Sequence, residues 1–173
     1  IKDGALAYPS EVAKTYSQTA YNSSMNKLDT YKDAITKIKE AGIYVIGRIV
    51  VFNDSHFGKD HPEECIESSV SSRLWPSAYS RLAWEYNVEL AKEAVDLMGF
   101  NEIQFDYVRF PEDAYNMSKN SSTDFRNVYN EEKAETIQNF LFYATDEIHK
   151  AMNDKVGAHE ILHRKAPPDD RIE

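Results

Sequence analysis

Residues 101–111 read Asn-Glu-Ile-Gln-Phe-Asp-Tyr-Val-Arg-Phe-Pro and contain a well-marked strand pattern. Side chains alternate along a strand, and this gives two rows: Ile103, Phe105 and Tyr107 on one face, and Glu102, Gln104, Asp106 and Val108 on the other. The apolar row suits a surface covered by helices, and the polar row suits the interior of a barrel near its mouth. Pro111 cannot donate to a sheet, so the strand ends before it, where α/β proteins place their sites.

Asp106 is the residue of this strand to which we assign chemistry. A half-buried carboxylate that faces inward is costly unless it has a partner or a function. The alternative is a structural one, in which Arg109 or a backbone amide fixes the carboxylate and so shapes the turn after the strand.

Helical and strand patterns alternate along the chain, which indicates repeated βα units and a parallel sheet. The predicted elements are a helix over 25–41, a strand over 43–52, a long polar connection over 53–80, a helix over 81–98, the strand within 101–111, a helix over about 128–152 and a short strand over 155–158. The predicted fold class is therefore α/β, a partial (β/α) TIM-type barrel of about three to four βα units, where a complete barrel takes about 250 residues.

Two regions follow from this pattern. Residues 1–158 form the partial barrel, and residues 159–173 form a charged, Pro-containing tail that we expect to be poorly ordered. The chain looks truncated at one or both ends. If the missing units are absent, the uncovered strand edges and apolar faces should lead to self-association or low stability.

Composition limits the class of partner. The net charge is −9 with a pI near 5.1 and no basic stripe, which argues against nucleic acid and anionic membranes and favours a neutral substrate. The single cysteine, Cys65, excludes an internal disulfide and a cysteine-cluster metal site. No apolar run is long enough to suggest a transmembrane segment.

The motif Phe-Asp-Tyr-Val-Arg-Phe-Pro at 105–111, preceded by Gly-Phe-Asn-Glu-Ile-Gln at 99–104, resembles the signature of the bacterial putative glycosyl hydrolase domain family. The likeness extends to Gly-Ile-Tyr-Val-Ile-Gly-Arg-Ile-Val-Val-Phe at 42–52, which is similar to an early strand of that family. It also includes Tyr86-Asn87 and the run Ala-Lys-Glu-Ala at 91–94.

The resemblance covers about residues 1–151. It implies a TIM barrel with a glycoside hydrolase-like site, a polysaccharide or cell-wall glycan as substrate, no cofactor, and an extracellular or cell-envelope location. The family usually continues with a strand that bears an Asp-containing motif, whereas here Val-Gly-Ala-His-Glu at 156–160 leads into the polar tail.

Glycoside hydrolysis commonly uses two carboxyl groups that flank the scissile bond. We assign one to Asp106, as nucleophile or charge stabiliser, with Gln104 and Arg48 keeping it ionised or contacting sugar hydroxyls. For Arg48, a salt bridge across the barrel is an equal alternative. Tyr107 and Arg109 complete the substrate-binding residues that we expect at this strand end.

Glu112 is the second catalytic carboxyl that we select, from candidates that also include Asp113, Asp54, Glu160 and residues outside the chain. Alternatively, Glu112 and Asp113 are solvated charges of the loop and have no catalytic role. Asp3, at the apparent end of a first strand, is placed for a sugar contact, with a turn-forming Asp-Gly pair as its structural alternative.

Two other functions fit parts of the sequence. A non-catalytic carbohydrate-binding barrel could use Tyr107, Trp75 and Trp84 as stacking platforms. A metal-dependent hydrolase could draw on four neighbouring residues of the long polar connection, although their spacing matches no strong motif. These are Asp54, His56, Asp60 and His61.

Overall fold

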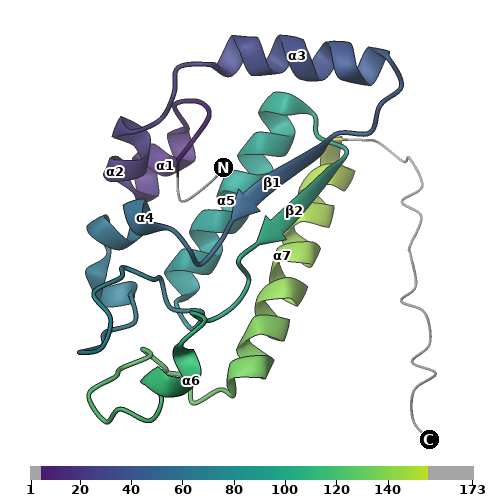
Figure 1. Ribbon diagram of the computed structural model, residues 1–173. Helices are drawn as coiled ribbons and strands as arrows, with labels where there is room; N and C mark the ends of the chain where they lie inside the picture. Colours follow the sequence, from purple (N-terminus) through teal and green to yellow (C-terminus); the bar gives the residue numbers. More distant parts are fainter. Residues whose placement is uncertain (1–4, 156–173) are drawn as a thin grey trace, which may run out of the picture.

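The computed structural model describes residues 5–155 as a mixed α/β arrangement, in which two strands are backed by helices (Figure 1). In chain order the elements are α1 (Glu11–Tyr16), α2 (Gln18–Asn22), α3 (Leu28–Glu40), β1 (Ile46–Val50), α4 (Ser55–Asp60), the 3₁₀ turn η1 (Pro62–Glu64), α5 (Arg81–Met98), β2 (Glu102–Asp106), α6 (Ala114–Met117) and α7 (Lys133–Lys155).

The two strands pair in parallel and form an open two-stranded sheet within the described residues. Their register places Arg48 opposite Gln104 and Val50 opposite Asp106. Because α5 connects β1 to β2, the predicted βαβ unit is confirmed. The predicted helix over 81–98 has the same bounds as α5, and Gly99 ends it in the left-handed conformation, at φ 64°.

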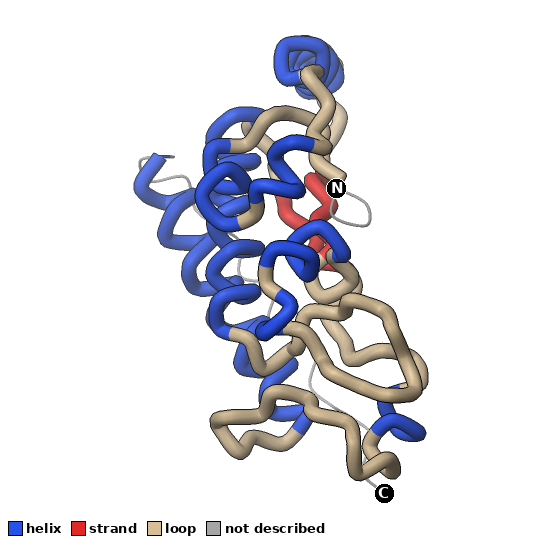
Figure 2. Tube along the Cα trace, turned by 90° about the vertical axis from the view of Figure 1, so that its left-hand side faces the viewer, coloured by secondary structure: helices blue, strands red, loops and turns tan. Residues whose placement is uncertain are grey.

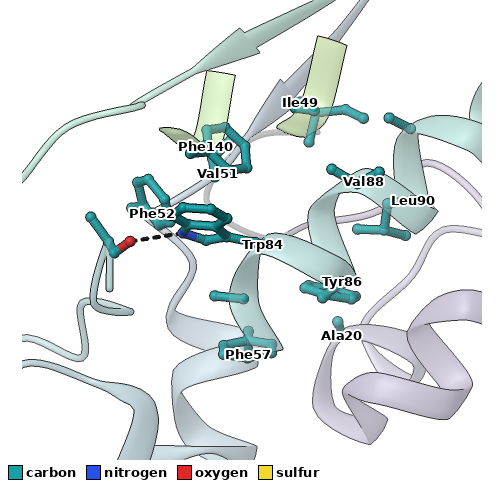
Figure 3. Packing of buried hydrophobic residues seen from close by; sticks show 14 of the residues in the cluster. Ala20, Ile49, Val51, Phe52, Phe57, Trp84, Tyr86, Val88, Leu90 and Phe140 are labelled. Atoms are coloured by element: carbon teal, nitrogen blue, oxygen red, sulfur yellow. Dashed lines mark hydrogen bonds between the residues drawn. The ribbon is translucent and has the colours of Figure 1, made fainter. Parts of the chain in front are cut away.

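Helices α5 and α7 cover one face of the sheet (Figure 1). The predicted apolar row lies on this side, since Ile103 and Phe105 pack against the buried core. Phe140 of α7 is fully buried, and its ring contacts Phe105 and Trp84, each at a centroid distance of 5.6 Å. Figure 3 shows this packing of α5, α7 and β1 side chains.

The opposite face of the sheet carries the polar row. The side chains at Arg48, Glu102 and Gln104 are exposed, and Ile46 at the start of β1 is 47% exposed. This alternation confirms the two faces predicted for the strand within 101–111. The (β/α) barrel that this polar face suggests would need further strands in addition to β1 and β2.

The carboxyl ends of both strands point toward one end of the molecule, where the long connections gather (Figure 1). Figure 2 shows these loops at the opposite end from the helix α3. Residues 53–80 and 107–132 therefore surround the strand ends at which we expect the site. No helix of the described residues combines the length and apolar character that crossing a membrane requires.

Several elements differ from the sequence-based prediction. Helices α1 and α2 were not predicted, because six and five residues are too few to show a helical period. The hydroxyls of Ser10 and Ser17 cap these helices instead. The helix predicted from about residue 128 begins at Lys133, and Val128 is exposed. The tail and residues 156–158 of the short strand lie outside the described residues.

Gly47 leads to a stability prediction. A Cβ at this buried position of β1 would lie 2.6 Å from Cδ2 and 2.8 Å from Cε2 of the Phe100 ring. We expect Gly47→Ala to lower the free energy of unfolding by about 1–3 kcal/mol because the ring must shift. Urea unfolding measures this. In a Phe100→Ala background the penalty should shrink, and an unchanged penalty would exclude the ring as its cause.

Candidate functional site

The two loops that follow β1 and β2 are fastened to each other. Glu67 and Asp124 form an antiparallel bridge, with backbone N–H to O distances of 2.9 and 2.8 Å. Nearby, the Ser77 hydroxyl donates to the backbone oxygen of Phe125 at 2.6 Å. Groups from both loops are therefore held in fixed positions around the strand ends.

Asp106 is the last residue of β2 and lies at the carboxyl end of the sheet. Its Oδ1 accepts a hydrogen bond of 2.7 Å from the backbone N–H of Tyr107, and its Oδ2 accepts one from Nη2 of Arg48 on the neighbouring strand. The side chain remains 37% exposed. Tyr107 has a φ of 54°, which turns the chain away from the sheet directly after the carboxylate.

These contacts bear on the alternatives that the sequence left open. The backbone amide and a cross-strand arginine hold Asp106, and the salt bridge expected as one possibility for Arg48 is present. Arg109, the other partner that the sequence suggested for Asp106, forms its ion pair with Glu112. Because the carboxylate is both fixed and exposed, these contacts leave it accessible to a ligand.

The pKa of Asp106 is lowered from its ordinary value, first by the hydrogen bond from the Tyr107 amide and then by that from Arg48. Donors of this kind stabilise the ionised form. Asp106 is therefore an anion at neutral pH. An ionised carboxylate can act as a nucleophile or stabilise positive charge, but it cannot donate a proton.

A pH titration tests this electrostatic environment. Because the pKa in the folded protein is depressed, the stabilising effect of Asp106 is present above the usual aspartate value of about 3.9 and is lost as the pH falls through the folded value. We expect Arg48→Gln to raise the pKa of Asp106, as followed by carboxyl-carbon NMR. Glu147, whose pKa is lowered mainly by its hydrogen bond from Lys92, serves as the control and should not change. An unmoved Asp106 would exclude Arg48 as a cause.

Glu112, the predicted second carboxyl, lies in the loop after β2. Its Oε1 accepts a hydrogen bond of 2.7 Å from Nη2 of Arg109, and its side chain is 78% exposed. An exposed ion pair of this kind is weak, so Glu112 resembles the solvated loop charge of the alternative interpretation. Asp113 precedes α6 and makes no capping hydrogen bond there with its side chain.

The other expected substrate-binding residues lie in different environments. Gln104 is exposed on the polar face of the sheet beside Arg48. Tyr107 is partly buried, with its ring centroid 6.3 Å from that of Trp75. Asp3 lies outside the described residues. The prediction of Trp75 and Trp84 as stacking platforms is wrong, because both are buried in the core, at 2% and 5% exposed.

Three of the four candidate metal ligands make structural contacts. Asp54 is buried and caps α4, and burial raises its pKa. Asp60 accepts hydrogen bonds from the hydroxyl and backbone N–H of Thr19, at 2.6 and 2.8 Å. His61 lies with Nε2 2.6 Å from the backbone oxygen of Tyr16. Among the side chains that the structure describes, no group of three or more His, Cys, Asp or Glu gathers as a metal site would require.

Arg73 is a residue that the sequence did not single out. It lies in the loop after β1, its Nη2 donates to Oδ1 of Asn53 at 2.6 Å, and its guanidinium carbon lies 4.5 Å from the centroid of the Trp75 ring. Arg73 also lines a hollow of about 380 Å³. No local pattern could have found it, because the arrangement depends on how the loop folds.

The fold and this strand end define the chain as a mixed α/β protein with polar side chains at the carboxyl end of its parallel strands. It belongs to the family described as "Putative glycosyl hydrolase domain", whose family model matches residues 1–159, and this confirms the resemblance found in the sequence.

One similar solved structure is the crystal structure of a hypothetical protein from Ruminiclostridium thermocellum ATCC 27405. It is 31% identical in sequence, with a TM-score of 0.65, and the match covers 84% of this chain and 73% of that chain. No curated protein matches the chain.

Proposed function

We propose that this protein is a glycoside hydrolase that acts on a polysaccharide or cell-wall glycan, with Asp106 as its ionised catalytic carboxylate. The observation that carries the proposal is the environment of Asp106: at the carboxyl end of β2, fixed by two hydrogen bonds, and still partly exposed. The family's description, as a glycosyl hydrolase domain, supports the same class of reaction.

In this proposal Asp106 attacks the anomeric carbon or stabilises the positive charge that develops there. Arg48 keeps it ionised, and Gln104 on the same face of the sheet binds sugar hydroxyls beside it. Tyr107 and Arg109 line the strand end. Together these residues provide one of the two carboxyl groups that glycoside hydrolysis commonly uses, namely the ionised one.

Glu112 is our proposed second carboxyl, which has to leave its ion pair with Arg109 and take up a proton before it can act as the acid. Its exposure and its single ion pair with Arg109 leave the side chain able to turn toward a bound glycan. Asp3 is proposed as a further sugar contact. We also propose that residues 1–158 form part of a (β/α) TIM-type barrel, because the polar face of the sheet points away from α5 and α7 as a barrel interior would.

A second candidate is a carbohydrate-binding protein without catalysis. The observation that favours it is the ion pair itself, since Arg48 already occupies one oxygen of the Asp106 carboxylate. In that case glycans would bind at the strand end without being cleaved. The burial of Trp75 and Trp84 removes two of the three aromatic platforms that this function was expected to use.

Reducing-end release separates the two candidates. The full chain is incubated with cell-wall and soluble polysaccharides, and new reducing ends are counted beside glycan binding measured by calorimetry. Hydrolysis that depends on Asp106 supports the proposed enzyme. Binding without new reducing ends across the panel would support the binding protein and contradict the hydrolase.

A further inference from the structure

Two arginines from different loops meet at one indole ring beside the strand end. Arg73 comes from the loop after β1 and Arg109 from the loop after β2, and their guanidinium carbons lie 4.5 and 5.5 Å from the Trp75 ring centroid. Arg109 also lies 5.0 Å from the ring of Tyr107, the residue that follows Asp106. Arg109 therefore lies close to the strand end that carries the proposed catalytic carboxylate, and Arg73 reaches the same indole ring from the other loop.

The aromatic rings hold these cations in place. Trp75 is 2% exposed, and its contact with Tyr107 ties it to the end of β2. A guanidinium over such a ring is attracted by the π-electrons. The buried ring thus favours the positions that the two guanidinium groups occupy, which lowers the cost of ordering them around a bound charged group.

The protein only partly neutralises these charges. The hydrogen-bond partner of Arg73 is the amide oxygen of Asn53, which carries no net charge. Arg109 has Glu112 as its counter-ion, and that carboxylate is solvent-exposed. Arg48 has its own counter-ion in Asp106, so the charge of Asp106 is already balanced. Among these named groups, the positive charge of Arg73 therefore has no anionic partner and can attract an anion, although the whole chain carries a net charge of −9.

A hollow of about 380 Å³ adjoins Arg73 and gives room for a sugar ring. Its wall includes hydroxyl groups suited to sugar hydroxyls, those of Ser68, Ser71 and Ser72. Of the acidic side chains of this wall, Glu67 is paired with Arg126 at 2.8 Å, and Glu63 lies 3.3 Å from Nδ1 of His61. Arg73 is the cation of this wall whose partner is a neutral amide.

We propose that the glycan bound at this end carries a carboxylate on the sugar, and that Arg73 and Arg109 bind it above Trp75. This rests on the proposed action on a glycan and names the class of substrate. The planar guanidinium fork matches a carboxylate and forms charge-assisted hydrogen bonds with it. The neutral substrate that the net charge favoured is thereby replaced by an acidic one.

Calorimetric binding to the full chain tests the inference. The probes are oligogalacturonate, the same oligomer with its carboxyl groups methyl-esterified, and muramic-acid-containing glycan strands, which carry their carboxylate on a lactyl group. We expect an acidic probe to bind at least about tenfold more tightly than the ester, with an affinity that falls as salt is added. Preference between the two acidic probes identifies the source of the carboxylate.

Matched variants locate the charge. Arg73→Gln and Arg109→Gln should each weaken binding of the preferred acidic probe by at least about tenfold, while Lys37→Gln, which removes an exposed charge from α3 at the other end of the molecule, should not. Equal binding of acid and ester, no binding of either acidic probe, or full affinity in both arginine variants would overturn the inference. If the inference is overturned but the protein cleaves neutral glycans, the proposed hydrolase function still stands. If acidic glycans bind through the two arginines but are not cleaved, the inference about the ligand stands and the hydrolase proposal is contradicted.

Discussion

Asp106→Asn should reduce glycan hydrolysis by roughly 10³-fold or more while glycan affinity changes little. The amide has almost the shape of the carboxylate, but its single oxygen can keep only one of the two hydrogen bonds that Tyr107 and Arg48 donate in the native protein. It carries no negative charge, however, so it can neither attack an anomeric carbon nor stabilise an oxocarbenium-like transition state. The measurement is the rate of reducing-end release beside the dissociation constant of the same glycan.

Glu102→Gln is the matched control. Glu102 also lies on the polar face of β2, but at its amino end, where its carboxylate accepts a hydrogen bond from the Tyr44 hydroxyl at 3.1 Å. Neutralising it removes the same charge from the same strand, far from the loops that surround the carboxyl end. Hydrolysis that survives Asp106→Asn, or falls equally in both variants, would mean that Asp106 is not the catalytic group.

The βαβ unit was readable from the sequence because each of its parts has a strong local signal. The helix over 81–98 shows a long apolar period and a glycine stop, and the strand within 101–111 alternates cleanly between apolar and polar residues. The short helices α1 and α2 depend on tertiary packing rather than on periodicity. Ala13 and Ala20 are completely buried within them, a feature that no local pattern predicts.

The candidate site was only partly predictable, for a related reason. Alternation along a strand shows that Arg48 and Asp106 face the same side, and the pairing of β1 with β2 brings them into contact. The position of Trp75 depends instead on how two loops fold against each other. Its ring is covered, so it supports Arg73 and Arg109 rather than stacking on a ligand.

Phe140→Ala should lower the free energy of unfolding by about 3–5 kcal/mol. Phe140 is fully buried, and its ring contacts Phe52 at 5.3 Å as well as Trp84 and Phe105 at 5.6 Å. These partners come from α5, from β2 and from the residues directly after β1, so the ring joins α7 to α5, to β2 and to the chain that leaves β1. Its removal leaves a cavity that rigid neighbours fill poorly. Chemical denaturation followed by circular dichroism measures the loss.

Phe142→Ala separates the loss of core packing from the loss of an aromatic residue in α7. Phe142 is two residues further along the same helix and is 65% exposed, so its truncation should change stability by less than about 0.5 kcal/mol. If both variants unfold alike, α7 is not held to the sheet through Phe140. The apolar face of the sheet would then need another cover, and the orientation that leaves Arg48 and Asp106 on the open side would lose its physical basis.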